Sequence, residues 1–307
     1  MRLKLIAASL LAAAAWADIT TDVRGALAKS NLPLAESLVQ NYRAQQGVTP
    51  DLIEAVSWLG RGALAAKQFD QAEAYAKETE KLSLAELKKR PLDAEPHLPL
   101  ALGASIEVRA QVLNERGQRG DALEFLQKEL ATYRSTSIRA RLQKNIHLLS
   151  LEGRVAPALD EREFLGSKPK PLSALKGSPV LVFFWAHWCP DCKREVAILN
   201  EIEKEYAAKH LVIVAPTQRY GYTARGEEAG PAEELKYIDE VRHKFYSELL
   251  DIPAPVSEEN FKNYGASTTP TLVLIDRAGR VAMYHPGRMT YDELRAKIDD
   301  VVSGKHS

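Results

Sequence analysis

Two cysteines, the only ones in the chain of 307 residues, lie in the stretch Phe184–Cys192, which reads Phe-Trp-Ala-His-Trp-Cys-Pro-Asp-Cys. A run typical of a buried strand, Val180–Phe184, leads into it, and a helix-like run, Lys193–Leu199, follows it. A cysteine at the start of a helix meets unpaired backbone N–H groups and the positive end of the helix dipole, which favour thiolate over thiol. The second cysteine follows one helical turn later. The pair therefore predicts thiol–disulfide exchange.

Three other interpretations of this cysteine pair remain open. A zinc site needs two further ligands, and the chain has no second cysteine pair and no closely spaced pair of histidines; His187 could supply one ligand, and nothing obvious supplies the fourth. A purely structural disulfide would close a very short loop and constrain the unfolded chain little. Two unreactive core cysteines are the third possibility. We expect no metal and no bound cofactor.

The N-terminal residues 1–17 have the pattern of an export signal. A short basic region with Arg2 and Lys4 precedes an apolar run, Leu5–Ala15, and Ala15-Trp16-Ala17 fits the small-x-small rule for cleavage. The alternative is a retained membrane anchor. We expect an exported protein, in a bacterial periplasm, with a mature chain that begins at Asp18.

The charge balance gives no support for binding to nucleic acid or to an anionic membrane. The chain has 41 basic and 41 acidic residues, and removal of residues 1–17 takes away two of the basic ones.

Residues 18–153 have the composition of helices, rich in Ala, Leu, Glu, Gln, Lys and Arg. The pattern Gly25-Ala26-Leu27-Ala28 recurs as Gly62-Ala63-Leu64-Ala65, and a weaker copy surrounds Gly120-Asp121-Ala122-Leu123. A period of this size resembles tetratricopeptide-type helical hairpins; an unrelated helical bundle is the alternative. We expect this region to bind a protein partner, or to act only as a spacer or a dimerisation surface.

Residues 154–307 alternate between strand-like and helix-like runs, which predicts an α/β domain of three layers. The expected strands are 180–185, 211–215, 271–276 and 280–284, and the expected helices are 190–209, 232–250 and 291–302. Turn residues at Asp276–Arg280 predict a hairpin between the last two strands.

This second half resembles the thioredoxin-like fold, more closely the exported TlpA/ResA-like thiol–disulfide oxidoreductases. The resemblance is carried by Pro171–Gly177, by Trp185–Cys192 and by Tyr264–Thr271 with its Thr-Pro-Thr sequence. It implies that Cys189 is the attacking nucleophile, exposed at the first turn of the helix, and that Cys192 is the buried resolving thiol.

Several other residues take expected roles from their positions. Pro190 suits the first helical turn, where a missing N–H costs nothing. The resemblance implies that Pro270 follows a cis peptide bond and brings the backbone of Thr269 against Cys189, where it would bind substrate together with Trp188. An ordinary turn before a strand is the alternative.

Glu195 lies three residues beyond Cys192, so both should share the inward face of the helix. The resemblance implies a partly buried carboxylate there that exchanges a proton with the resolving thiol; a solvated glutamate is the alternative. Thioredoxin has a buried aspartate six residues before its first cysteine, and Phe183 occupies that position here.

Three residues, His187, Pro190 and Asp191, are expected to adjust the redox chemistry. A carboxylate from Asp191 beside the Cys189 sulfur should raise the thiol pKa and favour a reductant. His187 would act in the opposite sense if protonated; otherwise it is a surface residue at the end of a strand. The long segment 217–231 is a candidate lid or specificity loop, or an insertion.

The sequence therefore predicts an extracytoplasmic thiol–disulfide oxidoreductase that reduces protein disulfides, with protein thiols and disulfides and an electron donor or acceptor protein as partners. An oxidase or isomerase is the alternative within this class. A redox-sensing scaffold that binds proteins is the alternative outside it.

Overall fold

The computed structural model describes residues 18–304, so the expected signal segment 1–17 lies outside the described residues. The chain divides into two compact units, Met1–Val112 and Leu113–Ser307. Seven helices precede the first strand: α1 (Ile19–Ala28), α2 (Leu32–Gln46), α3 (Pro50–Ala65), α4 (Phe69–Glu86), α5 (His97–Glu115), α6 (Arg119–Thr132) and α7 (Arg139–Ser150). They are followed by β1 (Phe164–Leu165), β2 (Val180–Phe184), α8 (Pro190–Tyr206), β3 (Val212–Val214), α9 (Pro231–Phe245), β4 (Ala254–Pro255), α10 (Glu258–Tyr264), β5 (Thr271–Ile275), β6 (Val281–Pro286) and α11 (Tyr291–Val302).

Within residues 18–112, the regular elements of the N-terminal unit are helices, as expected from the composition. Small residues allow its helices to approach closely. A Cβ atom on Gly60 of α3 would lie 3.5 Å from Cβ of Tyr75 in α4, and one on Gly62 would lie 2.5 Å from a methyl carbon of Leu27 in α1. Helix starts are capped by side chains, since Asn31 and Thr49 accept hydrogen bonds from backbone N–H groups of α2 and α3. The tetratricopeptide-type repeat stays a prediction.

The C-terminal unit contains a four-stranded sheet in the order β3-β2-β5-β6. Strand β2 is parallel to β3 and antiparallel to β5, and β5 forms the expected hairpin with β6. The four expected strands and three expected helices are present, with ends that differ by a few residues. The short strands β1 and β4, which pair with each other, and helix α10 were not expected from the sequence.

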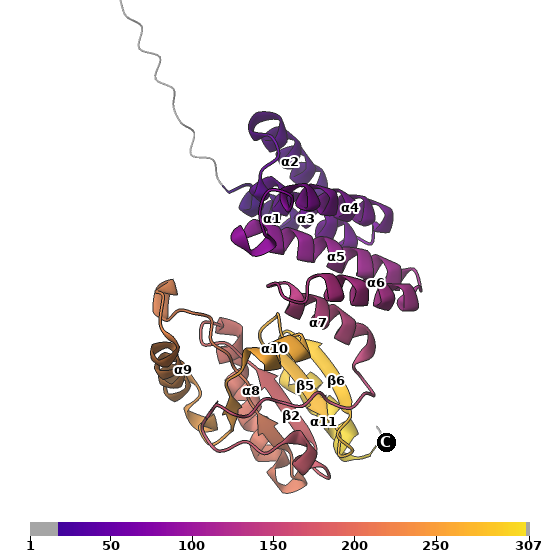
Figure 1. Ribbon diagram of the computed structural model, residues 1–307. Coiled ribbons are helices and arrows are strands. Elements are labelled where there is room, and N and C mark those ends of the chain that lie inside the picture. The colour runs from indigo at the N-terminus through magenta and orange to yellow at the C-terminus, as the bar shows by residue number, and fades with distance from the viewer. Residues whose placement is uncertain (1–17, 305–307) are drawn as a thin grey trace, which may run out of the picture. The chain divides into compact units, whose positions relative to one another are not determined.

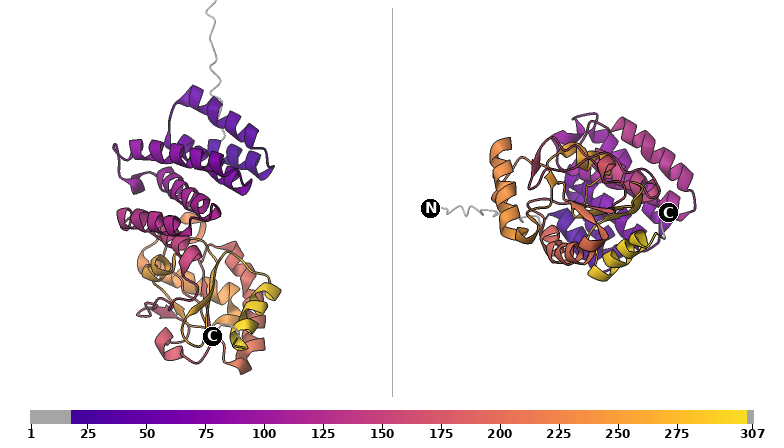
Figure 2. Two further views of the ribbon diagram at one scale, coloured as in Figure 1. Left: turned by 90° about the vertical axis from the view of Figure 1, so that its right-hand side faces the viewer. Right: turned by 90° about the horizontal axis from the view of Figure 1, so that it is seen from below.

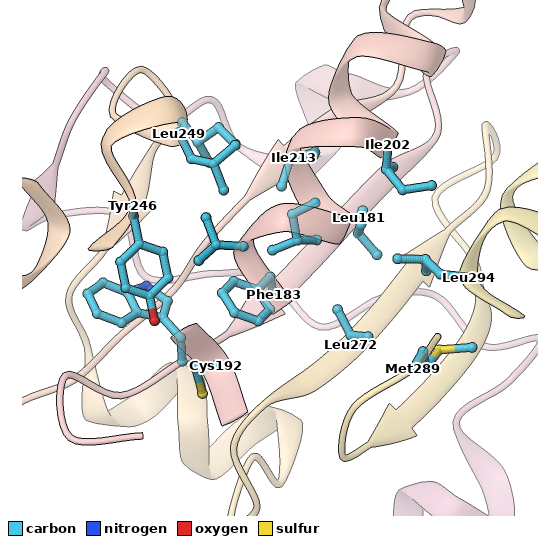
Figure 3. Close-up of a cluster of buried hydrophobic side chains, with 14 of the residues drawn as sticks. Leu181, Phe183, Cys192, Ile202, Ile213, Tyr246, Leu249, Leu272, Met289 and Leu294 are labelled. Carbon is cyan, nitrogen blue, oxygen red and sulfur yellow. The ribbon is translucent and has the colours of Figure 1, made fainter. Parts of the chain in front are cut away.

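Side chains alternate between the two faces of this sheet. Leu181 and Phe183 of β2 and Leu272 of β5 point into a core that also contains apolar side chains of α8, α9 and α11. Figure 3 shows Phe183 in the middle of this cluster and Cys192 at its edge. Val182 and Phe184 point to the other face, where Phe261 and Tyr264 of α10 cover them. The unit is therefore an α/β domain with helices on both faces of its sheet.

Helix α7 packs against α10 and β6 within the C-terminal unit (Figures 1 and 2). Gly265 ends α10 with a positive φ of 62°, and a Cβ atom there would lie 2.3 Å from the backbone nitrogen of Lys144 in α7. Only glycine fits so close a backbone contact. His147 of α7 also donates from Nε2 to the carbonyl oxygen of Asn263, 2.8 Å away. The run of helices that precedes the first strand ends at Ser150. The C-terminal compact unit begins earlier, at Leu113, and so includes α6 and α7.

Candidate active site

A disulfide joins Cys189 and Cys192, whose Cα atoms are 5.4 Å apart. Cys189 is the N-cap of α8 and Pro190 is the first residue of the helix. The backbone N–H of Cys192 points to the sulfur of Cys189 at 3.1 Å. This is the arrangement that stabilises a thiolate at the first cysteine when the pair is reduced.

Both cysteines are buried, and in one respect this corrects the sequence analysis. Cys192 is fully buried, as expected, but Cys189 is only 2% exposed rather than open to solvent. The sulfur of Cys189 is covered by the segment before β5, where the carbonyl oxygen of Thr269 lies 3.5 Å away. The peptide bond between Thr269 and Pro270 is cis. Trp188, by contrast, is 46% exposed and marks the accessible rim of the site.

Glu195 is completely buried one turn after Cys192. Its carboxylate accepts hydrogen bonds from the backbone N–H of Met289 at 3.2 Å and from Nε of Arg288 at 3.3 Å. Burial raises the pKa of Glu195 above its ordinary value, although these two donors oppose the shift. The solvated alternative is therefore wrong, and the carboxyl group can hold a proton more readily than a surface glutamate can.

The carboxylate of Asp191 forms an ion pair with the guanidinium of Arg194 on the outer face of α8. Both side chains are well exposed. The sequence predicts that Asp191 raises the pKa of the Cys189 thiol, an effect that a cation paired with Asp191 would weaken. Arg194 supplies that cation, and solvent screens both charges, so the expected effect on the thiol is reduced.

His187 is buried, so the surface alternative for this residue is wrong. It is 1% exposed, and its ring makes edge-to-face contacts with three tyrosines, Tyr220, Tyr222 and Tyr237, at centroid distances of 5.6, 5.4 and 5.3 Å. Burial lowers the pKa of His187. A neutral imidazole contributes no positive charge to the thiolate, so the expected protonated form is disfavoured.

A second buried carboxylate, Glu234 of α9, lies next to His187 and was missed in the sequence. Its Oε1 is 3.3 Å from Nε2 of His187. The same carboxylate accepts hydrogen bonds from the backbone N–H groups of Tyr220 at 2.5 Å and Gly221 at 2.9 Å. Glu234 thereby anchors the segment 217–231, and Tyr220 in that segment packs against Trp188 with ring centroids 5.5 Å apart. The segment therefore lies next to the residue that precedes Cys189, and its role as a lid, a specificity loop or an insertion stays a prediction.

Within residues 18–304, no three His, Cys, Asp or Glu side chains gather in a way that could hold a metal ion. The two cysteines are engaged with each other. A search of the same residues for helices that are long and apolar enough to cross a membrane finds none.

Comparison with known proteins finds similarities to the C-terminal half of the chain. Residues 172–302 match the thioredoxin-like domain family. The thioredoxin-like protein YneN of Bacillus subtilis is 28% identical over 48% of this chain and 79% of its own length. The thiol-disulfide oxidoreductase ResA of Bacillus thuringiensis is 28% identical over 48% of this chain and 78% of its own length.

A solved structure of the pneumococcal exposed lipoprotein thioredoxin from Streptococcus pneumoniae is 26% identical, covers 47% of this chain and 99% of its own length, and has a TM-score of 0.37. The family match lies in the C-terminal half of the chain. This half of the chain contains a thioredoxin-like domain and is homologous to the ResA-like thiol–disulfide oxidoreductases.

Proposed function

We propose that this protein is an extracytoplasmic thiol–disulfide oxidoreductase that reduces disulfides in other proteins. One observation carries the proposal: the disulfide between Cys189 and Cys192 sits at the N-terminus of α8 with the first sulfur against the backbone of Thr269. The names of the ResA relatives support the same reaction class.

The reaction begins with the reduced pair. The thiolate of Cys189 attacks one sulfur of a substrate disulfide, which gives a mixed disulfide and releases one substrate thiolate, which takes up a proton. Cys192 then loses its proton and attacks the Cys189 sulfur. The Cys189–Cys192 disulfide forms, the second substrate thiol leaves, and two electrons have passed to the substrate. A thiol or dithiol protein must return these electrons for another cycle.

We assign the proton of the resolving step to Glu195. It is the buried carboxylate nearest in sequence to Cys192 on α8, and its raised pKa suits a group that takes a proton from a thiol and later returns it. Thr269 and Pro270 would align the substrate backbone beside Cys189, and Trp188 would contact the substrate at the exposed rim.

Reduction is the proposed direction because Asp191 places a negative charge in the first turn of α8, where it opposes the helix dipole. The ion pair with Arg194 weakens this effect without removing the charge. We further propose that the helical region 18–153 binds a protein partner and that residues 1–17 direct export. The thioredoxin-like module would then be 154–307.

Two measurements on the full mature chain test the proposal. A titration of the dithiol against a thiol buffer, followed by tryptophan fluorescence, should give a reduction potential below about −230 mV; a value above about −180 mV would indicate an oxidase or isomerase. Cys189→Ser should abolish the acceleration by this protein of insulin reduction by a dithiol. If this variant reduces insulin as well as the unmodified chain does, the proposed reaction is wrong.

A further inference from the structure

A cavity of about 660 Å³ opens beside the dithiol, entirely within the unit 113–307. Trp188, Gln218 and Thr269 line it from the thioredoxin-like domain. Arg134, in the turn between α6 and α7, and Arg139, the first residue of α7, line it as well. A segment of the helical region thus contributes directly to the surface around the reactive sulfur.

Within residues 18–304, two of the residues that line this cavity carry a polar side-chain atom without a hydrogen-bond partner. Oε1 of Gln218 and Oγ1 of Thr269 are shielded from solvent, and neither has a partner among the described residues. Leaving such atoms unpaired is costly, so they are suited to a ligand that brings its own polar groups. A polypeptide backbone supplies both N–H donors and carbonyl acceptors, and Thr269 is the residue whose carbonyl lies against Cys189.

Charged side chains of both signs surround the cavity, and some of them form ion pairs whereas Arg134, among the described residues, does not. Lys262 pairs with Glu258 and Glu259 of the same helix, and Arg139 pairs with Glu259 at 3.4 Å. Arg134 is exposed, and no ion pair of this residue occurs within residues 18–304. Arg134 also lines an adjoining cavity of about 570 Å³, together with other residues of α6 and α7.

We propose that this cavity binds an extended segment of the substrate protein, with an acidic side chain close in sequence to the target cysteine paired to Arg134. The proposal rests on the proposed thiol–disulfide exchange and specifies its substrate class. Gln218 and Thr269 would bind the backbone of the segment, Trp188 would contact its apolar side chains, and Arg134 would select its charge.

Two matched disulfide-linked peptide dimers test this selection. Each carries a single cysteine in an otherwise identical sequence, flanked by glutamates in one peptide and by lysines in the other. With dithiothreitol as the electron source, the full chain should reduce the acidic peptide roughly three- to tenfold more efficiently in kcat/KM. The preference should shrink as salt is added, because exposed charges are screened.

Arg134→Glu should remove or reverse this preference. Lys128→Glu is the matched control, because it makes the same charge change on the exposed surface of α6 outside both cavities and should keep the preference. Arg134→Gln serves as a second variant in case the glutamate disturbs folding, and it should reduce the ratio toward one.

If the unmodified chain reduced both peptides equally well, the proposed preference for acidic segments would be wrong, but the proposed thiol–disulfide exchange would stand. No reduction of either peptide or of insulin would instead overturn the proposed reaction. If Arg134→Glu changed only self-association, measured by sedimentation, the cavity would belong to an interface between copies of the chain, and the inference would be wrong.

Discussion

Two buried carboxylates flank the dithiol, and their surroundings differ. Glu195, on α8, receives two long hydrogen bonds, one of them from the partly exposed Arg288. Glu234, in the first turn of α9, receives two backbone N–H groups and lies against His187, which is itself buried. Both are at most 1% exposed. Burial alone therefore does not identify a proton carrier, because the hydrogen-bond donors around a buried carboxylate differ from one site to the other.

The largest expected effect comes from removing the better-bonded carboxylate. In Glu234→Gln, an amide N–H₂ would face backbone N–H groups, which leaves a buried donor unpaired. We expect the free energy of unfolding to fall by about 2–3 kcal/mol, measured by urea denaturation. Glu233→Gln, at the exposed neighbouring position, is the control. Glu195→Gln should lower the free energy of unfolding by less than about 1 kcal/mol. Equal losses of stability in Glu234→Gln and Glu195→Gln would show that the hydrogen-bond donors do not distinguish the two carboxylates.

A kinetic effect should appear at Glu195 instead. Formation of the mixed disulfide with Cys189 should be little changed in Glu195→Gln, whereas attack by Cys192 should be roughly tenfold slower near neutral pH. The rate of this second step in the unmodified chain should rise with pH as Glu195 loses its proton, with a midpoint above the ordinary glutamate value because burial raises its pKa.

Stopped-flow release of a fluorescent peptide thiol measures both steps. Glu201→Gln, on the exposed side of the same helix, should behave like the unmodified chain. A resolving step with the same rate and pH profile in Glu195→Gln would mean that the carboxylate only fills space.

The smallest effect concerns the partner of Glu234. Burial holds the pKa of His187 below its unfolded value of 6.5. In that pH range the unfolded chain binds a proton that the folded chain does not, so stability should be lost as pH falls below about 6.5. His187→Gln should reduce this loss by an amount on the order of 1 kcal/mol.

Denaturation at a series of pH values decides the sign of this effect. His147, another buried histidine with a lowered pKa, contributes to the same window and serves as the comparison in His147→Gln. If His187→Gln made the loss at low pH larger, protonated His187 would be forming a stabilising ion pair with Glu234, and the neutral state proposed here would be wrong.

The sequence predicted the parts of the site that depend on near neighbours. Cys189, Cys192 and Glu195 lie along the start of one helix, so their spacing in the sequence predicts that they lie close together. Glu234 could not be identified, because its role depends on contact with His187, far away in the chain. A glutamate in the first helical turn after Pro231 is usually a surface residue that interacts with the helix dipole. The burial of Cys189 likewise depends on the distant segment around Thr269.

The elements missed by the sequence were short or lacked periodicity. Strands β1 and β4 have two residues each, and β4 includes Pro255. Such strands form because tertiary contacts hold them, not because of local preference. Helix α10 has seven residues, too few for a clear amphipathic pattern.

Gly265 has a consequence for how this protein can be divided. The stretch that matches the thioredoxin-like family, 172–302, is shorter than the compact unit 113–307, in which the backbone of α7 also rests on the glycine that ends α10. The length of chain that matches the family and the length that packs as one body are therefore different. Recombination that transferred residues 172–302 alone would carry the chemistry to a new protein but leave behind Arg134 and the helix that covers α10.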